Sequence, residues 1–262
     1  MKTSNKILLA LFGLAALSIV SFVFAAKAND IPMEDRIQQA ADEGLVIGNN
    51  KVSNIQKTVQ PFRYLSVGDH IRVELVQGTP GKVEVNGEEN IIPLIELTEE
   101  NDTLKLSLAD KNFNSSKPLT VVVHVDESLE LIREADYSFV STVGAITLGD
   151  IIIQNHGHNG RMELNILANE LSVSQVGGEG LLDIDGTAQS LKFEGMGSGQ
   201  FDSRDLSITK AELKMNGAYN IHVFSSDSLS LDATGKGRIR YSGNPSQIDK
   251  KLVGSIRLEE IK

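Results

Sequence analysis

LKFEGMGSGQF, residues Leu191–Phe201, contains every part of the repeat that decides the fold. It begins with an apolar-x-apolar pair, passes through a glycine-bearing turn and then returns to an apolar residue. Alternation of apolar and polar residues with a period of two indicates a half-buried β-strand. Glycine at the turn supplies the positive φ that a sharp corner requires. The stretch therefore predicts two strand segments joined by a tight corner.

Four other stretches share this pattern at a nearly even spacing. They are Ile151–Leu164, Leu171–Ile184, Leu213–Val223 and Leu229–Tyr241. An apolar residue follows the key glycine by four positions, or by five in the first copy. The key glycines are Gly157, Gly178, Gly197, Gly217 and Gly235. A period near 20 with one turn per copy indicates a solenoid.

Each copy offers one alternating face that it cannot bury alone, so neighbouring copies must stack. An antiparallel meander of short hairpins would show the same alternation, but it gives no reason for so even a spacing. We therefore favour stacked coils. The side chains expected to point inward are Leu171, Val173, Leu191, Phe193, Leu213, Met215, Leu229 and Leu231.

The first half of the chain is also rich in strand signals, which start at Phe62. Alternating or continuously apolar segments occur at Ile71–Leu75, Lys82–Asn86, Thr103–Leu108 and Leu119–Val125. Ile91–Leu97 resembles a strand that Pro93 breaks or confines to a sheet edge. The predicted fold is all-β, with this β-rich portion leading into a solenoid from about Leu129.

The N-terminus predicts export. Lys2 and Lys6 precede an uncharged run, Ile7–Ala26, and the small-x-small site Ala26-Lys27-Ala28 follows. These three features are typical of a secretory signal peptide, with cleavage expected after Ala28. The alternative is an uncleaved anchor, because the uncharged run is long enough to span a bilayer as a helix.

The expected domains are a signal peptide at 1–28, a polar lead-in or linker at 29–57, and a solenoid domain at 58–261. Within the lead-in, Met33–Gly44 has the composition of a short helix that ends at its glycine. After the signal the sequence has no second apolar span, so the expected mature protein has no membrane-spanning segment.

Charge and cysteine content exclude several classes of function. The net charge of −10 becomes −13 when Lys2, Lys6 and Lys27 leave with the signal peptide. This acidity argues against nucleic acid and against electrostatic binding to anionic membranes. The chain has no Cys, which excludes a lipoprotein anchor, thiol catalysis and Cys-ligated metal. A mature chain of this length can bury a core without disulfides.

The sequence resembles a known family at these repeats and beyond them. The stretches that carry the resemblance are Phe62–Gly78 (FRYLSVGDHIRVELVQG), Val83–Ile92 (VEVNGEENII), Gly197-Ser198-Gly199 and Ile239–Pro245 (IRYSGNP). They are similar to the family of putative auto-transporter adhesins with a head GIN domain, over roughly Thr58–Ile261. The resemblance implies a right-handed β-helix-like architecture in an exported protein of Gram-negative-type bacteria.

His156 and His158 form the one histidine cluster that we weigh as a metal pair. Neutral imidazole is a common metal ligand, but no nearby Cys or carboxylate completes a set of three or four ligands. A polar turn at a solenoid corner is the interpretation that we favour. His70, His124 and His222 lie singly in strand-like alternation, where we expect surface or lightly buried positions.

Five aspartates fall on or near successive copies and predict an acidic ladder. They are Asp183, Asp185, Asp202, Asp205 and Asp232. Glycan-cleaving chemistry would need two carboxylates about 5–10 Å apart in a cleft, one of them with a raised pKa. A solvated face that keeps an acidic protein soluble is the interpretation that we favour. The aspartates lack the Gly-Gly-x-Gly-x-Asp repeat of calcium-binding β-rolls.

Other chemical motifs are missing. Gly195–Gly199 precedes no helix and lacks the Gly-Lys-Ser/Thr of a phosphate loop, and no Gly-x-Ser-x-Gly nucleophile elbow is present. The chain has no Trp, which weakens sugar recognition by ring stacking. Four aromatic residues in the repeats could be exposed, although packing is the role that we expect. They are Tyr137, Phe139, Tyr219 and Tyr241.

The sequence thus predicts an exported cell-envelope binding protein, an adhesin without catalytic activity, in the periplasm, on the outer surface or secreted. One alternative is a structural or stress-related envelope protein that binds a protein partner. Another is a polysaccharide-acting enzyme built on a β-helix. We assign no catalytic, cofactor or metal residues. The ligand, whether glycan or protein, and the oligomeric state stay open.

Overall fold

The computed structural model describes residues 45–68, 70–109 and 112–261. The expected signal peptide at 1–28 and the expected helix Met33–Gly44 lie outside these residues. The chain divides into two compact units, of which the first includes β1 (Leu45–Ile47) paired in parallel with β8 (Asn112–Asn114). Within the described residues, no helix is long and apolar enough to cross a membrane.

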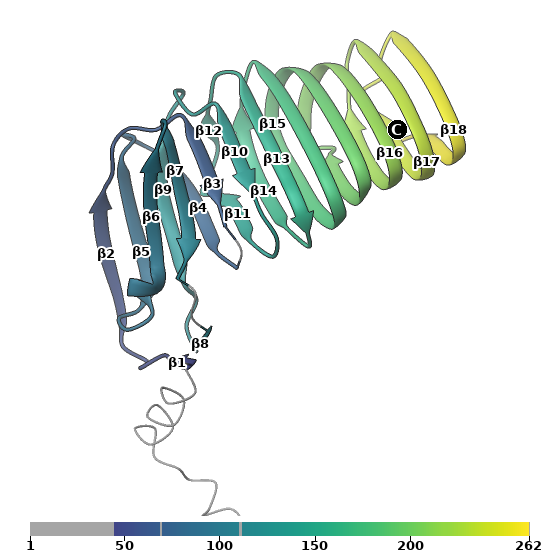
Figure 1. Ribbon diagram of the computed structural model, residues 1–262. Coiled ribbons are helices and arrows are strands. Elements are labelled where there is room, and N and C mark those ends of the chain that lie inside the picture. Colours follow the sequence, from purple (N-terminus) through teal and green to yellow (C-terminus); the bar gives the residue numbers. More distant parts are fainter. Residues whose placement is uncertain (1–44, 69, 110–111, 262) are drawn as a thin grey trace, which may run out of the picture. The chain divides into compact units, whose positions relative to one another are not determined.

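The second unit contains stacked parallel coils that form a β-solenoid (Figure 1). Its coil strands are β13 (Ile151–His158), β14 (Arg161–Leu167), β15 (Glu170–Ser203), β16 (Leu206–Phe224), β17 (Ser228–Ser242) and β18 (Gln247–Glu260). Every pairing among them is parallel. A meander would pair them antiparallel, so the predicted stacking is confirmed.

The coils repeat more evenly than the alignment of the five copies suggests. Leu191 pairs with Ala211, and Leu213 pairs with Phe193. The expected alignment of Leu191 with Leu213 was therefore wrong by one inward position. Ala211 is small, and its sequence context does not mark it as the apolar residue with which this copy begins. The true column runs from Leu191 to Ala211 and on to Leu229.

Six glycines stack in one column at the corner of the solenoid, each with positive φ. They are Gly157, Gly177, Gly197, Gly217, Gly235 and Gly254. A Cβ on Gly217 would lie 1.9 Å from the carbonyl oxygen of Gly197, far inside van der Waals contact. The expected key glycine of the second copy, Gly178, was wrong. Its neighbour Gly177 pairs with Gly157 in the column.

The N-terminal portion of this unit continues both sheets of the solenoid. β3 (Tyr64–Val67) and β4 (Arg72–Gln77) pair in parallel with β10 (Leu131–Glu134) and β11 (Phe139–Thr142). Short β12 (Ile146–Thr147) pairs with β14. One sheet extends through β7 (Thr103–Leu108) and β6 (Ile95–Glu100), and the other through β9 (Thr120–Val125), β5 (Lys82–Glu88) and β2 (Val52–Thr58). The outermost pairs are antiparallel.

Two expectations for this portion need correction. Pro93 does not lie in a strand but in the 3-10 helix η1 (Ile92–Leu94), after which β6 begins. Proline fits there because its fixed φ suits a first helical turn. β2 overlaps the end of the expected polar lead-in at 29–57, yet it forms an edge strand on β5. Its side chains are mostly exposed, so its sequence lacks the alternation of apolar residues that predicts a strand.

Large apolar side chains fill the solenoid core. All eight residues that the sequence predicts to point inward are buried, with at most 3% of their surface exposed. The rings of Phe193 and Phe201 stack at 4.5 Å between centroids, and Tyr219 meets Phe193 edge-on at 5.9 Å. These arrangements suit the quadrupoles of aromatic rings. Core packing is thus the role of Tyr219.

A row of buried polar side chains, which we call the polar thread, crosses this core; it consists of Glu134, Ser138, Asn155 and Gln175. Glu134 and Asn155 are buried, and Asn155 Nδ2 donates to Glu134 Oε2 at 2.8 Å. Ser138 Oγ donates to the other carboxylate oxygen at 2.9 Å. Gln175 Nε2 donates to the backbone carbonyl of Gly180 at 2.9 Å, and Tyr219 Oη donates to the backbone carbonyl of Gln175 at 3.0 Å. Buried polar groups need such partners.

The glycine column predicts a position-specific loss of stability. We expect Gly217→Ala to lower the free energy of unfolding by more than about 3 kcal/mol, because the methyl group collides with the backbone of Gly197 in the preceding coil. Gly144→Ala is the matched control, since Gly144 also has positive φ but would place its Cβ in open space. There the left-handed conformation alone should cost about 1–2 kcal/mol. Urea denaturation followed by circular dichroism measures both, and equal losses would contradict the collision.

Candidate ligand-binding face

We call the sheet that contains β13, before the glycine corner, the first sheet, and the sheet that contains β14, after the corner, the second sheet. Each late coil crosses the second sheet and points side chains outward at alternate positions. Because the strands are in register, these side chains form two columns that run along the stack. The first column is Gln200, Asn220, Arg238 and Arg257. The second is Asp202, His222, Arg240 and Glu259. Neighbouring members are about 4.8 Å apart along the stack.

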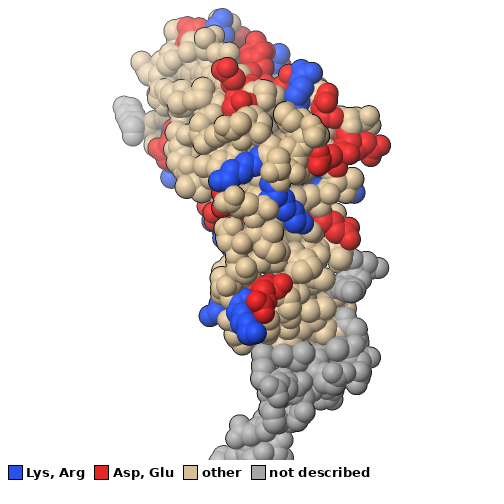
Figure 2. Space-filling view, turned by 90° about the vertical axis from the view of Figure 1, so that its left-hand side faces the viewer, with Lys and Arg blue, Asp and Glu red and all other residues tan. Residues whose placement is uncertain are grey.

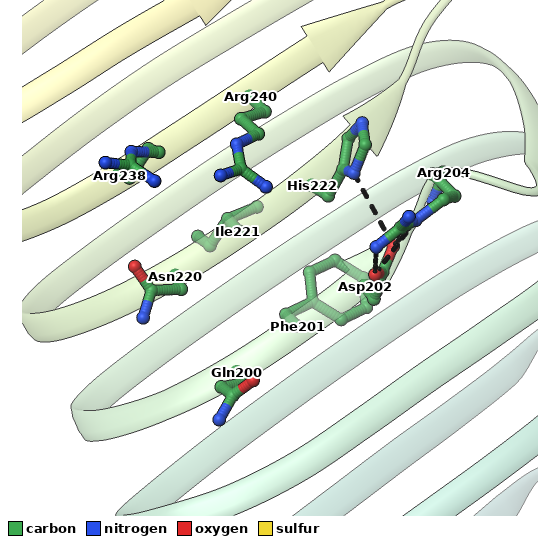
Figure 3. Close-up of a pocket in the computed structure, with 9 residues that line it drawn as sticks. All are labelled: Gln200, Phe201, Asp202, Arg204, Asn220, Ile221, His222, Arg238 and Arg240. Atoms are coloured by element: carbon green, nitrogen blue, oxygen red, sulfur yellow. Dashed lines mark hydrogen bonds and ion pairs between the residues drawn. The ribbon is translucent and has the colours of Figure 1, made fainter.

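A shallow hollow of about 300 Å³ lies between the two columns. Its nine lining residues, drawn in Figure 3, lie on β15, β16 and β17, except Arg204, which lies in the turn after β15. Phe201 and Ile221 come between the columns and are buried, so the surface there is formed by the polar side chains on either side. The hollow can therefore bind a ligand by hydrogen bonds and charge.

Asp202 and Arg204 form the ion pair at one end of the hollow. Burial raises the pKa of Asp202, but hydrogen bonds from Arg204 outweigh this and leave the pKa below its usual value. His222 Nδ1 lies 4.0 Å from Asp202 Oδ1. Burial is the main cause that lowers the pKa of His222, and Arg204 and Arg240 lower it further against the effect of Asp202.

Three arginines surround one carboxylate where the hollow borders on β18; Arg238 and Arg240 line the hollow, and Arg257 and Glu259 lie beside it on β18. Arg238 Nε lies 3.6 Å and Arg240 Nε 3.7 Å from Glu259 Oε2, and Arg257 Nη1 lies 3.6 Å from Glu259 Oε1. All three distances exceed those of direct hydrogen bonds, which run to about 3.2 Å. Glu259 therefore offsets charge without occupying the guanidinium N–H groups.

Two aspartates of the predicted ladder have pKa values that other members of the ladder help to raise. Burial raises the pKa of Asp183, and the charges of Asp185 and Asp202 add to the effect. Burial likewise raises the pKa of Asp185, with Asp205 and Asp202 contributing. The ladder is thus partly confirmed.

Asp232 was wrongly included in that ladder. It lies on β17 before the corner glycine, where it pairs in register with Lys214 and Lys251. Its carboxylate is 3.5 Å from Lys251 Nζ. Asp232 therefore belongs to the outer surface of the first sheet.

The two histidines considered as a metal pair contact different neighbours. His156 Nε2 lies 3.1 Å from Ser174 Oγ, and His158 Nδ1 lies 3.7 Å from Asp136 Oδ1. Burial lowers the pKa of His156, and Arg133 adds to the effect. In the part of the chain that the structure describes, no group of three or more His, Asp or Glu side chains is arranged to hold a metal ion.

Two further histidines, which the sequence pattern places singly, each have a partner. His70 stacks on the exposed ring of Tyr137 at 5.2 Å between centroids. His124 Nε2 lies 3.3 Å from Glu84 Oε1. Hydrogen bonds from Lys82, Asn54 and His124 lower the pKa of Glu84 to about 2.

Two of the remaining aromatic residues pack as expected. Phe139 lies between Arg72 and Arg161, whose guanidinium carbons are 4.7 Å and 5.7 Å from its ring centroid. Tyr241 is half-buried against the core.

Figure 2 shows the side of the described unit that carries β2, where Lys and Arg lie near Asp and Glu in small groups. The three arginines on β17 and β18, with Arg238 and Arg257 in the first column and Arg240 in the second, are the feature that the sequence pattern did not predict. Arg238 and Arg257 occupy matching positions on neighbouring coils, and aligning the last coil with the five copies would have found them.

The fold and this face define a class of protein: a parallel β-solenoid whose stacked coils present columns of polar side chains. The chain belongs to the family described as putative auto-transporter adhesin, head GIN domain, whose model matches residues 61–245. No curated protein matches the sequence.

Crystal structures of other bacterial proteins share the fold. A putative adhesin from Bacteroides fragilis is 21% identical, with a TM-score of 0.72, and the match covers 82% of this chain and 100% of the other. A putative adhesin from Parabacteroides merdae is 18% identical with a TM-score of 0.60, covering 84% and 100%. A putative lipid binding protein from Parabacteroides distasonis is 19% identical with a TM-score of 0.63, covering 83% and 100%.

Neighbouring aspartates on this face should respond to pH with opposite signs. A raised pKa means that ionising Asp183 destabilises the fold, and this penalty develops as the pH rises from the unfolded value of 3.8 through the raised one. We expect Asp183→Asn to stabilise the protein at pH 7 and to lose that gain at about pH 3.

Asp202 has a lowered pKa, so its ionised form stabilises the fold above the unfolded value, and that stability is lost as the pH falls through the folded value. Asp202→Asn should therefore destabilise at pH 7, by less than about 1 kcal/mol for so exposed an ion pair. Urea denaturation at pH 7 and about pH 3 measures both variants. Two changes of the same sign at pH 7 would contradict this assignment.

Proposed function

We propose that this protein is an exported binding module of the bacterial cell envelope, an adhesin that acts by binding rather than by catalysis. The observation that carries the proposal is the open hollow between two in-register polar columns. The family description supports an adhesin-like role at the cell surface, and the signal-like N-terminus at 1–28 supports export.

The carboxylates of this face support binding over glycan cleavage. Hydrolysis needs a carboxylic acid with a raised pKa beside a second carboxylate across a cleft. Asp183 and Asp185 have raised pKa values, but they do not line the hollow. Asp202 does line it, and its pKa is lowered by Arg204, which suits a fixed ion pair better than an acid catalyst.

The test is binding of purified residues 29–262 to an array of glycans and extracellular-matrix proteins, with the retained material assayed for cleavage products. We expect saturable binding and intact ligand. Binding with release of shortened products would replace the proposal by the glycan-acting enzyme. If the protein bound no member of the array, the adhesin function would be contradicted.

A second candidate is a structural or stress-related role in which a protein partner adds a strand to β18. Within the described residues β18 pairs only with β17, and Val253 is 51% exposed on it. Unpaired edges recruit extended segments. Lys250 pairs with the core residue Leu231, so the added strand should present an acidic side chain to it.

A synthetic peptide of alternating Val and Glu tests this candidate. We expect it to protect the β18 amides from hydrogen exchange in the wild type and not in Val253→Lys. Met196→Lys is the control, because Met196 is also exposed but lies within the stack. If the peptide still protected the β18 amides in Val253→Lys, the candidate would be contradicted. It would also be contradicted if light scattering showed a dimer and hydrogen exchange showed the β18 amides protected without peptide.

A further inference from the structure

We propose that the hollow and the adjoining surface of β18 bind an acidic glycan, whose carboxylate or sulfate groups contact Arg238, Arg240 and Arg257 while its hydroxyl groups contact Gln200 and Asn220. The inference rests on the proposed binding function and names its site and ligand class.

The first argument is the supply of cationic donors. Arg238, Arg240 and Arg257 share Glu259 as an ion partner, at 3.6–3.7 Å. Their side chains are 42%, 40% and 69% exposed. Three cations around one anion leave an excess of positive charge, in a chain whose net charge is −10. Guanidinium groups bind carboxylate and sulfate-like oxygens in a bidentate manner.

The second argument is the amide pair in the same column. Gln200 and Asn220 pair in register, and Asn220 pairs with Arg238. Among the described residues, neither amide group hydrogen-bonds to protein, and both residues are exposed. A carboxamide can both donate and accept, as a sugar hydroxyl does. The column therefore offers groups for hydroxyl recognition directly beside groups for acid recognition.

The third argument is geometry. The columns run across the strands, so a ligand chain lying between them meets a new pair of side chains about every 4.8 Å. Figure 3 shows Gln200, Asn220 and Arg238 on successive segments along one side of the hollow. An open site of about 300 Å³ without a closing wall suits a linear polymer that passes through it.

Charge on the rest of the face sets the direction of binding. Asp183, Asp185 and Asp205 lie beyond Asp202 and Arg204, where an anionic chain would be repelled. The same overall acidity opposes nucleic acid, which needs many phosphate contacts. We expect the acid groups of the glycan to bind at β17 and β18, and its hydroxyl groups to lie over Gln200 on β15 and Asn220 on β16.

Isothermal titration with oligogalacturonate tests the proposal, with its methyl ester as the uncharged probe. Arg238→Gln/Arg240→Gln should weaken binding at least about tenfold, because two charge-assisted contacts are lost. The matched control is Lys214→Gln/Lys251→Gln, which removes the same charge from the first sheet and should bind as the wild type does. Circular dichroism shows that each variant is folded.

Further measurements separate the alternatives. Equal loss in both double variants, or no loss in the arginine variant, would overturn the site while the binding function stands. Binding of the methyl ester as tightly as the acid would overturn the acidic ligand class. A wild type that binds other array members but no oligogalacturonate or heparin oligomer would overturn this inference alone. A wild-type protein that binds no ligand at all would contradict the proposed binding function as well.

The amides distinguish a glycan from any polyanion. Gln200→Ala/Asn220→Ala should weaken oligogalacturonate severalfold and leave polyglutamate binding unchanged. If polyglutamate binds as tightly as the glycan and the amide variant changes neither, the ligand is an acidic peptide and the proposal is wrong.

Discussion

The solenoid depends on a close approach between the carbonyl oxygen of one corner glycine and the α-carbon of the glycine in the next coil. At Gly177, Gly197, Gly217, Gly235 and Gly254 a Cβ would lie about 2 Å from that oxygen. Side chains are excluded there by contact with backbone, which cannot move aside without breaking the stack. This constraint fixes one point in every coil, and the parallel register on both sides follows from it.

A second glycine column makes room for the polar thread of the interior. A Cβ on Gly160 would lie 2.2 Å from Glu134 Oε2, and one on Gly180 would lie 2.5 Å from Asn155 Oδ1. Glycine therefore permits two things in this fold: close backbone approach at the corner, and buried polar side chains from the opposite sheet. Later coils replace the polar side chains with apolar ones, as Met215 and Ala233 show in the same register.

Much of the fold could be predicted because its physical causes are local. Alternation at Leu171–Val173 or Leu229–Leu231 identifies inward positions without knowledge of any partner strand, and those residues are buried. Register could not be predicted as well, because it depends on which residue of the next coil lies opposite. Ala211 and Gly177 were missed for this reason: each looks ordinary in sequence and is fixed only by its neighbours in the stack.

The site was harder to predict than the fold because outward residues have no periodic requirement. Asp183 and Asp202 were found because several aspartates recur at similar positions, whereas Asp232 shares that recurrence and lies on another sheet. Positions shortly before and shortly after the corner belong to different faces, and the sequence alone does not mark the corner closely enough. The three arginines of the site were missed because Arg238, Arg240 and Arg257 stand among ordinary strand residues.

This division between inward and outward positions explains how such a fold can acquire a ligand. Most inward residues are held to apolar or glycine identities by the stack, and the few polar ones, such as Glu134 and Asn155, bond to each other inside it, while outward residues need only tolerate solvent. Asp202, His222 and Arg240 occupy one outward column in consecutive coils, so its charge changes from negative to positive without altering the core. A binding face can therefore arise one coil at a time, each substitution adding a contact at a spacing that the backbone has already fixed.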